Sequence, residues 1–201
     1  MLNIHLMGTG PFADAVATRL QGPACEHWDG SRGVYDSTNW PRARARVLIS
    51  AERDNSAEQH VEDVAWGTLQ PWIPVQLEAR DVRVGPVVTP GRGACLRCFD
   101  RRQEQHGRRN HTDLELDKAP STGMPFRGYT PAHAAMAAAV INTITASDKA
   151  LTEAASKVWR FGFSELSVRQ AVVIPVSGCS RCDSLDSAGR RSARLSRFFA
   201  F

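Results

Sequence analysis

Long hydrophobic runs and lysine are both scarce in this chain. No apolar stretch approaches the ~18 residues that a membrane-spanning helix requires, and the first residues lack the charged segment of a secretory signal. Lysine occurs only as Lys118, Lys149 and Lys157, so the net charge of +4 comes almost wholly from arginine. The basic residues are interleaved with acidic ones, without an aromatic-basic recognition motif. We therefore expect a cytoplasmic protein that binds neither membranes nor nucleic acid.

The composition is that of an ordinary globular protein. Of the 201 residues, 42% are hydrophobic and 23% charged, which excludes the fibrous and disordered classes. The length suits a single domain. We predict one domain over residues 1–183, followed by a basic tail over residues 184–201 that ends in aromatic residues.

A glycine turn stands near the start of the chain. Residues 2–7 alternate as in a strand, Gly8 and Gly10 follow, and residues 11–20 have helical spacing. With Ala13, this matches the loose G-x-G-x-x-A pattern of dinucleotide-binding folds. However, Pro11 removes a backbone N–H, and we expect the Phe12 ring to occupy the place of an anion. The pattern therefore predicts a Rossmann-like fold rather than nucleotide binding, with Gly8 and Gly10 as degenerate cofactor contacts.

Further elements follow the same α/β alternation. The sequence predicts strands at residues 25–28 and 46–50, a loop at 29–39, helices at 56–67 and 131–147, and hairpins at 72–77 with 82–89 and 158–163 with 168–176. Thr130 is the expected N-cap of the last helix and Pro131 its first residue. Because that alanine-rich helix is apolar nearly all round, we expect it to be buried.

Four cysteines form two knuckles of identical C-x-x-C spacing. They are Cys95 with Cys98 and Cys179 with Cys182. Four thiolates fill a tetrahedral zinc site and leave no position for water or substrate, so the predicted metal is structural. The alternative is a redox dithiol, which would be expected at a helix N-terminus, whereas each knuckle here follows a β-like run. The fifth cysteine, Cys25, is expected to be a small buried hydrophobe.

The order of these features resembles the ThiF/MoeB-type adenylation fold. The similarity runs from the Gly8 turn, through G-P-V-V-T-P-G-R-G-A-C-L-R-C at residues 85–98, to the alanine-rich helix and the second knuckle. With P-W-I-P-V at residues 71–75, it is closest to the cyclodehydratase-partner or leader-peptide-binding proteins of thiazole/oxazole-modified microcin biosynthesis. Because the predicted first strand begins at residue 2, we expect no counterpart of their N-terminal peptide clamp.

This resemblance implies a partner protein that supports peptide modification by a separate ATP-using enzyme of the YcaO type. The domain is then not itself catalytic, ATP and magnesium are not expected as cofactors, and a homodimer is expected. Asp54 follows a strand as the magnesium-binding segment of active relatives does, and is the one candidate metal-ATP ligand. Two alternatives stay open: an ATP-dependent enzyme that adenylates a carboxyl group, and a zinc-thiol protein that responds to oxidation.

Overall fold

A computed structural model describes most of the chain. The described residues are 2–8, 10–20, 25–28, 30–78, 80–107, 128–164 and 167–182. The predicted tail at residues 184–201 lies outside them, as does the side chain of Cys25.

One mixed sheet of seven strands runs through these residues, in the order β2-β1-β3-β4-β5-β6-β7. The strands are β1 (Leu2–Gly8), β2 (Cys25–Trp28), β3 (Ala43–Ser50), β4 (Trp72–Leu77), β5 (Asp81–Val84), β6 (Lys157–Gly162) and β7 (Val168–Val172). The first four strands in this order are parallel, and the last three are antiparallel. The predicted α/β class is confirmed, and the parallel part of the sheet is consistent with the predicted Rossmann-like domain.

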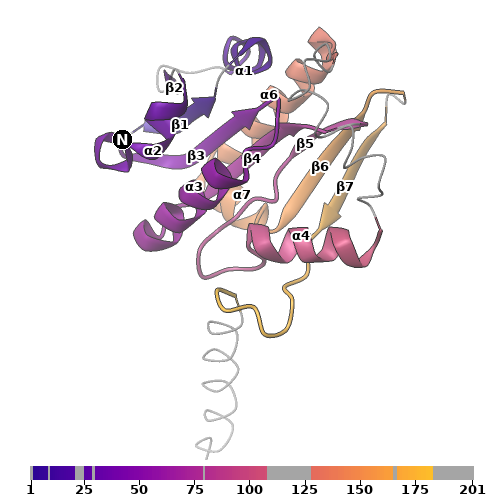
Figure 1. Ribbon diagram of the computed structural model, residues 1–201. Coiled ribbons are helices and arrows are strands. Elements are labelled where there is room, and N and C mark those ends of the chain that lie inside the picture. The colour runs from indigo at the N-terminus through magenta and orange to yellow at the C-terminus, as the bar shows by residue number, and fades with distance from the viewer. Residues whose placement is uncertain are drawn as a thin grey trace, which may run out of the picture.

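Helices cover both faces of the sheet (Figure 1). They are α1 (Pro11–Ala17), α2 (Gly30–Tyr35), α3 (Asn55–Thr68), α4 (Leu96–Gln105), α6 (Pro131–Thr145) and α7 (Asp148–Glu153), with a short 3₁₀-helix η1 (Ser37–Asn39). Buried residues of α1 and α6 belong to one core cluster, and those of α3 and α4 to another. None of the described helices is both long and apolar enough to cross a membrane.

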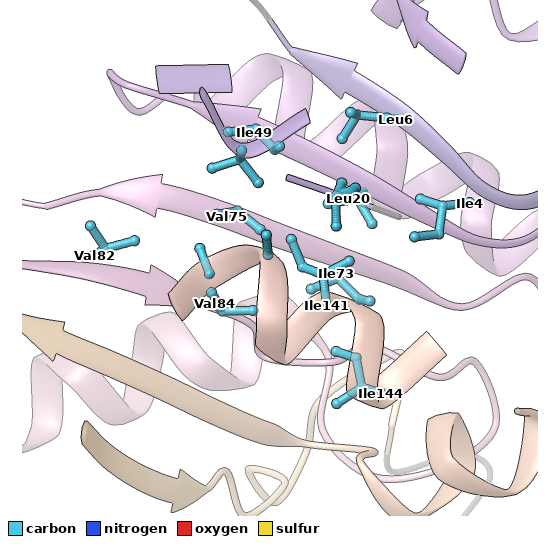
Figure 2. Packing of buried hydrophobic residues seen from close by; sticks show 14 of the residues in the cluster. Ile4, Leu6, Leu20, Ile49, Ile73, Val75, Val82, Val84, Ile141 and Ile144 are labelled. Carbon is cyan, nitrogen blue, oxygen red and sulfur yellow. The ribbon is translucent and has the colours of Figure 1, made fainter. Parts of the chain in front are cut away.

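The central strands are buried on both faces, as parallel strands between two helical layers must be. In β3, Val47 and Ile49 pack into the cluster beneath α1 and α6, and Leu48 packs into the opposite cluster. Figure 2 shows the first cluster, where Ile73 and Val75 of β4 lie close to Ile141 of α6. The two clusters therefore place α1 and α6 on one side of the sheet, and α3 and α4 on the other.

The predicted loop at residues 29–39 is wrong, because this stretch holds α2 and η1. Its glycine and serine content indicated a loop, but tertiary contacts decide its conformation. Val34 is buried, and the indole N–H of the buried Trp40 donates to the Gly33 carbonyl oxygen at 2.8 Å. Two buried side chains and this hydrogen bond hold the segment against the sheet.

Two strand ends and the burial of one helix also differ from the prediction. The last strand, β7, ends at Val172 rather than at residue 176. The second strand of the first hairpin ends at Val84 rather than at residue 89, since Gly85 has a positive φ of 95° and Pro86 has no N–H to donate. Helix α6 begins as predicted, with Thr130 and His133 in a capping box. Its face with Ala135 and Ala139 is exposed, however, so the helix is buried on one side only.

Candidate functional site

The four predicted cysteine ligands lie together in one buried cluster. Their sulfur atoms all lie within 4.8 Å of one another. The Sγ–Sγ distances are 3.7 Å from Cys95 to Cys98, 3.6 Å from Cys95 to Cys179 and 3.8 Å from Cys98 to Cys182. A tetrahedral site with ~2.3 Å metal–sulfur bonds has sulfur–sulfur edges of about 3.8 Å. The thiols are therefore free rather than disulfide-bonded, and their geometry can hold a metal ion.

The two knuckles come from different kinds of local structure. Cys95 is the N-cap of α4 and Cys98 lies in its first turn, whereas Cys179 and Cys182 lie in the turns after β7. Each knuckle follows a strand, as predicted, but the first one also begins α4, so the expectation that neither knuckle lies at a helix N-terminus is wrong. A helix N-terminus is also where a redox pair would lie, so position alone does not favour a metal. What distinguishes the two chemistries is the meeting of all four sulfurs.

Backbone donors face two of these sulfur atoms. The N–H of Cys95 donates to Cys182 Sγ at 3.2 Å, and the N–H of Val176 donates to Cys98 Sγ at 3.3 Å. Such hydrogen bonds favour thiolates and are common around metal-bound cysteine.

The thiol pKa values also reflect the crowding of the cluster. The hydrogen bond with Cys182 and burial raise the pKa of Cys95, and burial raises that of Cys98 to about 11. Burial also acts to raise the pKa of Cys179, but hydrogen bonds from the N–H groups of Cys182 and Arg181 outweigh it and lower the pKa to about 7. A bound cation would lower all of these values, because it compensates the thiolate charges.

A glutamate of α3 ties the two knuckles together, and the sequence alone did not single it out. Glu62 accepts a hydrogen bond from the N–H of Leu96 at 2.8 Å, which fixes the start of α4. Its other oxygen lies 3.8 Å from Arg181, which also forms an ion pair with Asp63. Burial raises the pKa of Glu62, although the Leu96 hydrogen bond and the Arg181 charge oppose this. In the sequence, the two adjacent acidic residues Glu62 and Asp63 were the signal that could have indicated this role.

The glycine turn has the expected backbone but a weak anion site. Gly8 ends β1, and a Cβ on it would lie 2.5 Å from the carbonyl oxygen of Ile49. Gly10 has φ 83° and precedes α1, which is only seven residues long and begins at Pro11. The prediction that Phe12 blocks an anion is wrong, because its ring is buried and packs edge-on against Tyr129.

Asp54 is exposed and caps α3. Its Oδ1 accepts from the N–H of Ala57 at 2.9 Å, and the Tyr35 hydroxyl donates to its Oδ2 at 3.5 Å. The neighbouring Arg53 pairs with Glu58 at 2.9 Å and with both carboxylate oxygens of Asp100 at 2.8 Å. Both residues thus have structural partners within the fold.

A buried ionic cluster lies beside the cysteine cluster, and the sequence analysis missed it. Arg83 of β5 lies between Glu78 and Glu58, at 2.6 and 3.4 Å, with its guanidinium over the ring of Phe99. Arg160, directly opposite on β6, pairs with Glu78 and Asp81. The sequence signal for this cluster was the alternation V-R-V at residues 82–84. It places Arg83 on the face of the sheet that α4 covers, opposite to the two valines.

Comparisons with known proteins find the fold but no close relative. No model of a protein family matches the sequence, and no curated protein matches it. The heterocyclase TruD has 17% identity and a TM-score of 0.63, over 94% of this chain and 28% of TruD. A heterocyclase solved with substrate and cofactor has 16% identity and a TM-score of 0.63, over 90% of this chain and 25% of its own. The chain therefore spans only about a quarter of these proteins.

A second group of similar structures is MccB of E. coli, a microcin C7 biosynthetic enzyme. Its complex with selenomethionine-labelled MccA has 14% identity and a TM-score of 0.56, over 89% of this chain and 66% of MccB. MccB has also been solved with both AMPCPP and MccA, and that structure has 20% identity and a TM-score of 0.52. At such low identity, what this chain shares with both groups is the fold.

Proposed function

We propose that this chain is a non-catalytic, metal-stabilised ThiF-like scaffold that assists the modification of a ribosomal peptide. In this role it works with a peptide and a separate ATP-using cyclodehydratase of the YcaO type. The observation that carries the proposal is the similarity to the heterocyclase TruD, which extends over 94% of this chain. The MccA complexes of MccB support a peptide as the partner.

The metal in this proposal is zinc. Four cysteine sulfurs at tetrahedral spacing are the ligand set of closed structural zinc sites. Cys95, Cys98, Cys179 and Cys182 would hold it, and all four positions would then be filled. The ion would stabilise the fold and would not activate water.

The lack of catalysis is inferred from the residues that ATP would require. Helix α1 is short, and Pro11 has no N–H at its first position, which weakens anion binding. Asp54 caps α3, and Arg53 is held by two carboxylates. A magnesium-bound triphosphate would have to break these contacts.

Isothermal titration with ATP and magnesium tests the non-catalytic role. We expect no saturable binding, either for the unchanged chain or for Asp54→Asn, which keeps a good helix cap but removes the charge. Micromolar binding that Asp54→Asn abolishes would contradict the proposal. The positive test is reconstitution with a YcaO-type enzyme and its precursor peptide, where adding this chain should increase the loss of water seen by mass spectrometry.

A second candidate function is adenylation of a peptide carboxyl group. The observation in its favour is that MccB, which shares the fold, has been solved with AMPCPP together with MccA. Exchange of labelled pyrophosphate into ATP, dependent on added peptide, would support this candidate over the scaffold. Such exchange should disappear in Asp54→Asn if Asp54 holds the metal of ATP.

A further inference from the structure

The last strand of the sheet, β7, combines three features that rarely occur together without a partner. It lies at the edge of the sheet in the described part of the chain (Figure 1), and all five of its residues are exposed. Val168 and Val172 are 54% and 60% exposed, and Ile174 just beyond the strand is 67% exposed. An exposed, apolar edge strand presents unpaired backbone groups to other chains, and proteins usually protect such edges.

The register of β7 shows which backbone groups face outward. The N–H of Val173 donates to the Ser156 carbonyl oxygen, so this pair is of the hydrogen-bonded type. In an antiparallel pair the two types alternate, which makes the pairs of Arg169 and Ala171 with β6 hydrogen-bonded as well. The N–H and C=O groups of Val168, Gln170 and Val172 therefore point away from β6, toward the free edge.

A groove adjoins this edge, between β7 and α4. It has a volume of about 310 Å³ and an apolar floor that includes Phe99, Val158 and Val173. Its sides carry Arg102, His106 and Arg169, and none of the described residues that line it is acidic. Arg102 donates hydrogen bonds to the carbonyl oxygens of Ile174 and Pro175, at 3.2 Å each, which hold its guanidinium beside the groove.

We propose that the free edge of β7 binds an extended acidic peptide segment of a partner by adding it to the sheet as an eighth strand. Alternate side chains of the added strand would lie over the groove, where acidic groups meet the cations. The others would lie against Val168 and Val172 on the opposite face, where apolar groups fit. This inference rests on the proposed function, in which the chain binds a peptide or a partner enzyme, and it names β7 as the binding surface.

Charge argues against three other occupants. A second copy of the chain, paired through β7, would place two sets of these cations side by side. The chain's own residues 184–201 carry Arg190, Arg191, Arg194 and Arg197, so they too have the wrong sign. Residues 108–127, which follow α4, carry four basic residues against three acidic ones and are not acidic overall either. An acidic partner is the occupant that the groove complements.

The test is fluorescence anisotropy with a labelled peptide that alternates valine and glutamate over about six residues, the usual length of a strand. We expect saturable binding that weakens with added salt. A control peptide with the same sequence but N-methylated at alternate residues keeps charge and composition and cannot form the ladder. It should bind at least roughly tenfold more weakly. Equal binding of the two peptides, or no saturable binding, would overturn strand addition.

Two pairs of variants locate the binding on β7. Gln170→Pro removes an outward N–H without touching the bonds to β6, and should weaken binding roughly tenfold, whereas Gln170→Ala should not. Val172→Glu should also weaken binding, whereas Leu69→Glu, which alters an exposed apolar residue at the end of α3, should not. Circular dichroism checks that each variant is folded. If Gln170→Pro does not fold, the comparison with the N-methylated peptide still tests whether the peptide binds by strand addition.

Other outcomes would refute the inference in distinguishable ways. A concentration-dependent dimer in sedimentation that Val172→Glu abolishes would assign the edge to a second copy instead. The peptide assay contains no enzyme or ATP, so its failure leaves the reconstitution test of the scaffold role intact. Conversely, ATP binding by this chain would contradict the scaffold role and leave the β7 surface standing.

Discussion

Gly8 shows how closely two parallel strands approach at the carboxyl end of the sheet. Adding a Cβ there would place it 2.5 Å from the Ile49 carbonyl oxygen, a backbone atom that cannot move aside easily. We expect Gly8→Ala to reduce the free energy of unfolding by about 1–3 kcal/mol, measured by urea denaturation. Gly67→Ala in α3 is the matched control, because a Cβ added at this position would have no neighbouring atom within 4 Å. It should leave stability unchanged or raise it by up to about 1 kcal/mol.

A fully buried histidine on β1 makes stability depend on pH. Burial, and then the charge of Arg46, lower the pKa of His5 to about 4, and Arg46 lies 2.7 Å from its Nδ1. The folded pKa is below the unfolded value, so the unfolded chain binds the proton more readily. Stability should be full above about pH 6.5 and should fall by roughly 3 kcal/mol as the pH drops toward 4.

Comparing urea denaturation of the unchanged chain and His5→Gln between pH 7 and pH 5 isolates this contribution. The variant is expected to be less stable at neutral pH, because it loses the contact with Arg46, but its stability should change less with pH. Identical pH slopes for the two proteins would show that His5 is not the titrating group.

At the scale of elements, the antiparallel half of the sheet is held by a buried ionic cluster. Arg83 is only 1% exposed and joins β5 to Glu78, just after β4, and to Glu58 of α3. We expect Arg83→Met to destabilise the fold by up to about 3–5 kcal/mol, because Glu58 and Glu78 would each lose one of the two guanidinium groups that pair with it. Arg97→Met, at an exposed position of α4, is the control and should change stability little. An equal effect of both variants in thermal denaturation would contradict this role.

The elements that sequence could predict are those with a strong local pattern. Thr130 and Pro131 marked the start of α6 correctly because capping chemistry is local. Helix α2 could not be foreseen, since the burial of Val34 and Trp40 depends on contacts with distant elements. The clustering of the four cysteines was predicted from their spacing, whereas Glu62 and Arg83 gain their roles only from neighbours across the fold.

At the scale of the whole molecule, the cysteine cluster joins segments far apart in sequence. Cys95 and Cys179 are 84 positions apart, yet their sulfurs lie 3.6 Å from each other. The cluster belongs to the core that α3 and α4 form with the sheet, and Glu62 links it to α3. A metal ion here would therefore fasten α4 to the chain that follows β7, next to the proposed peptide surface.

The most direct test of the account is the metal content of the purified chain, combined with its stability after metal removal. We expect one zinc ion per chain, and we expect Cys98→Ser or Cys182→Ser to lose it. Each variant should also have a much lower unfolding temperature, because structural zinc sites contribute roughly 10 kcal/mol or more to folding. Acid should release the ion, because protons compete for the thiolates. A chain that is fully folded, metal-free and unchanged in stability by a strong chelator would contradict the central claim.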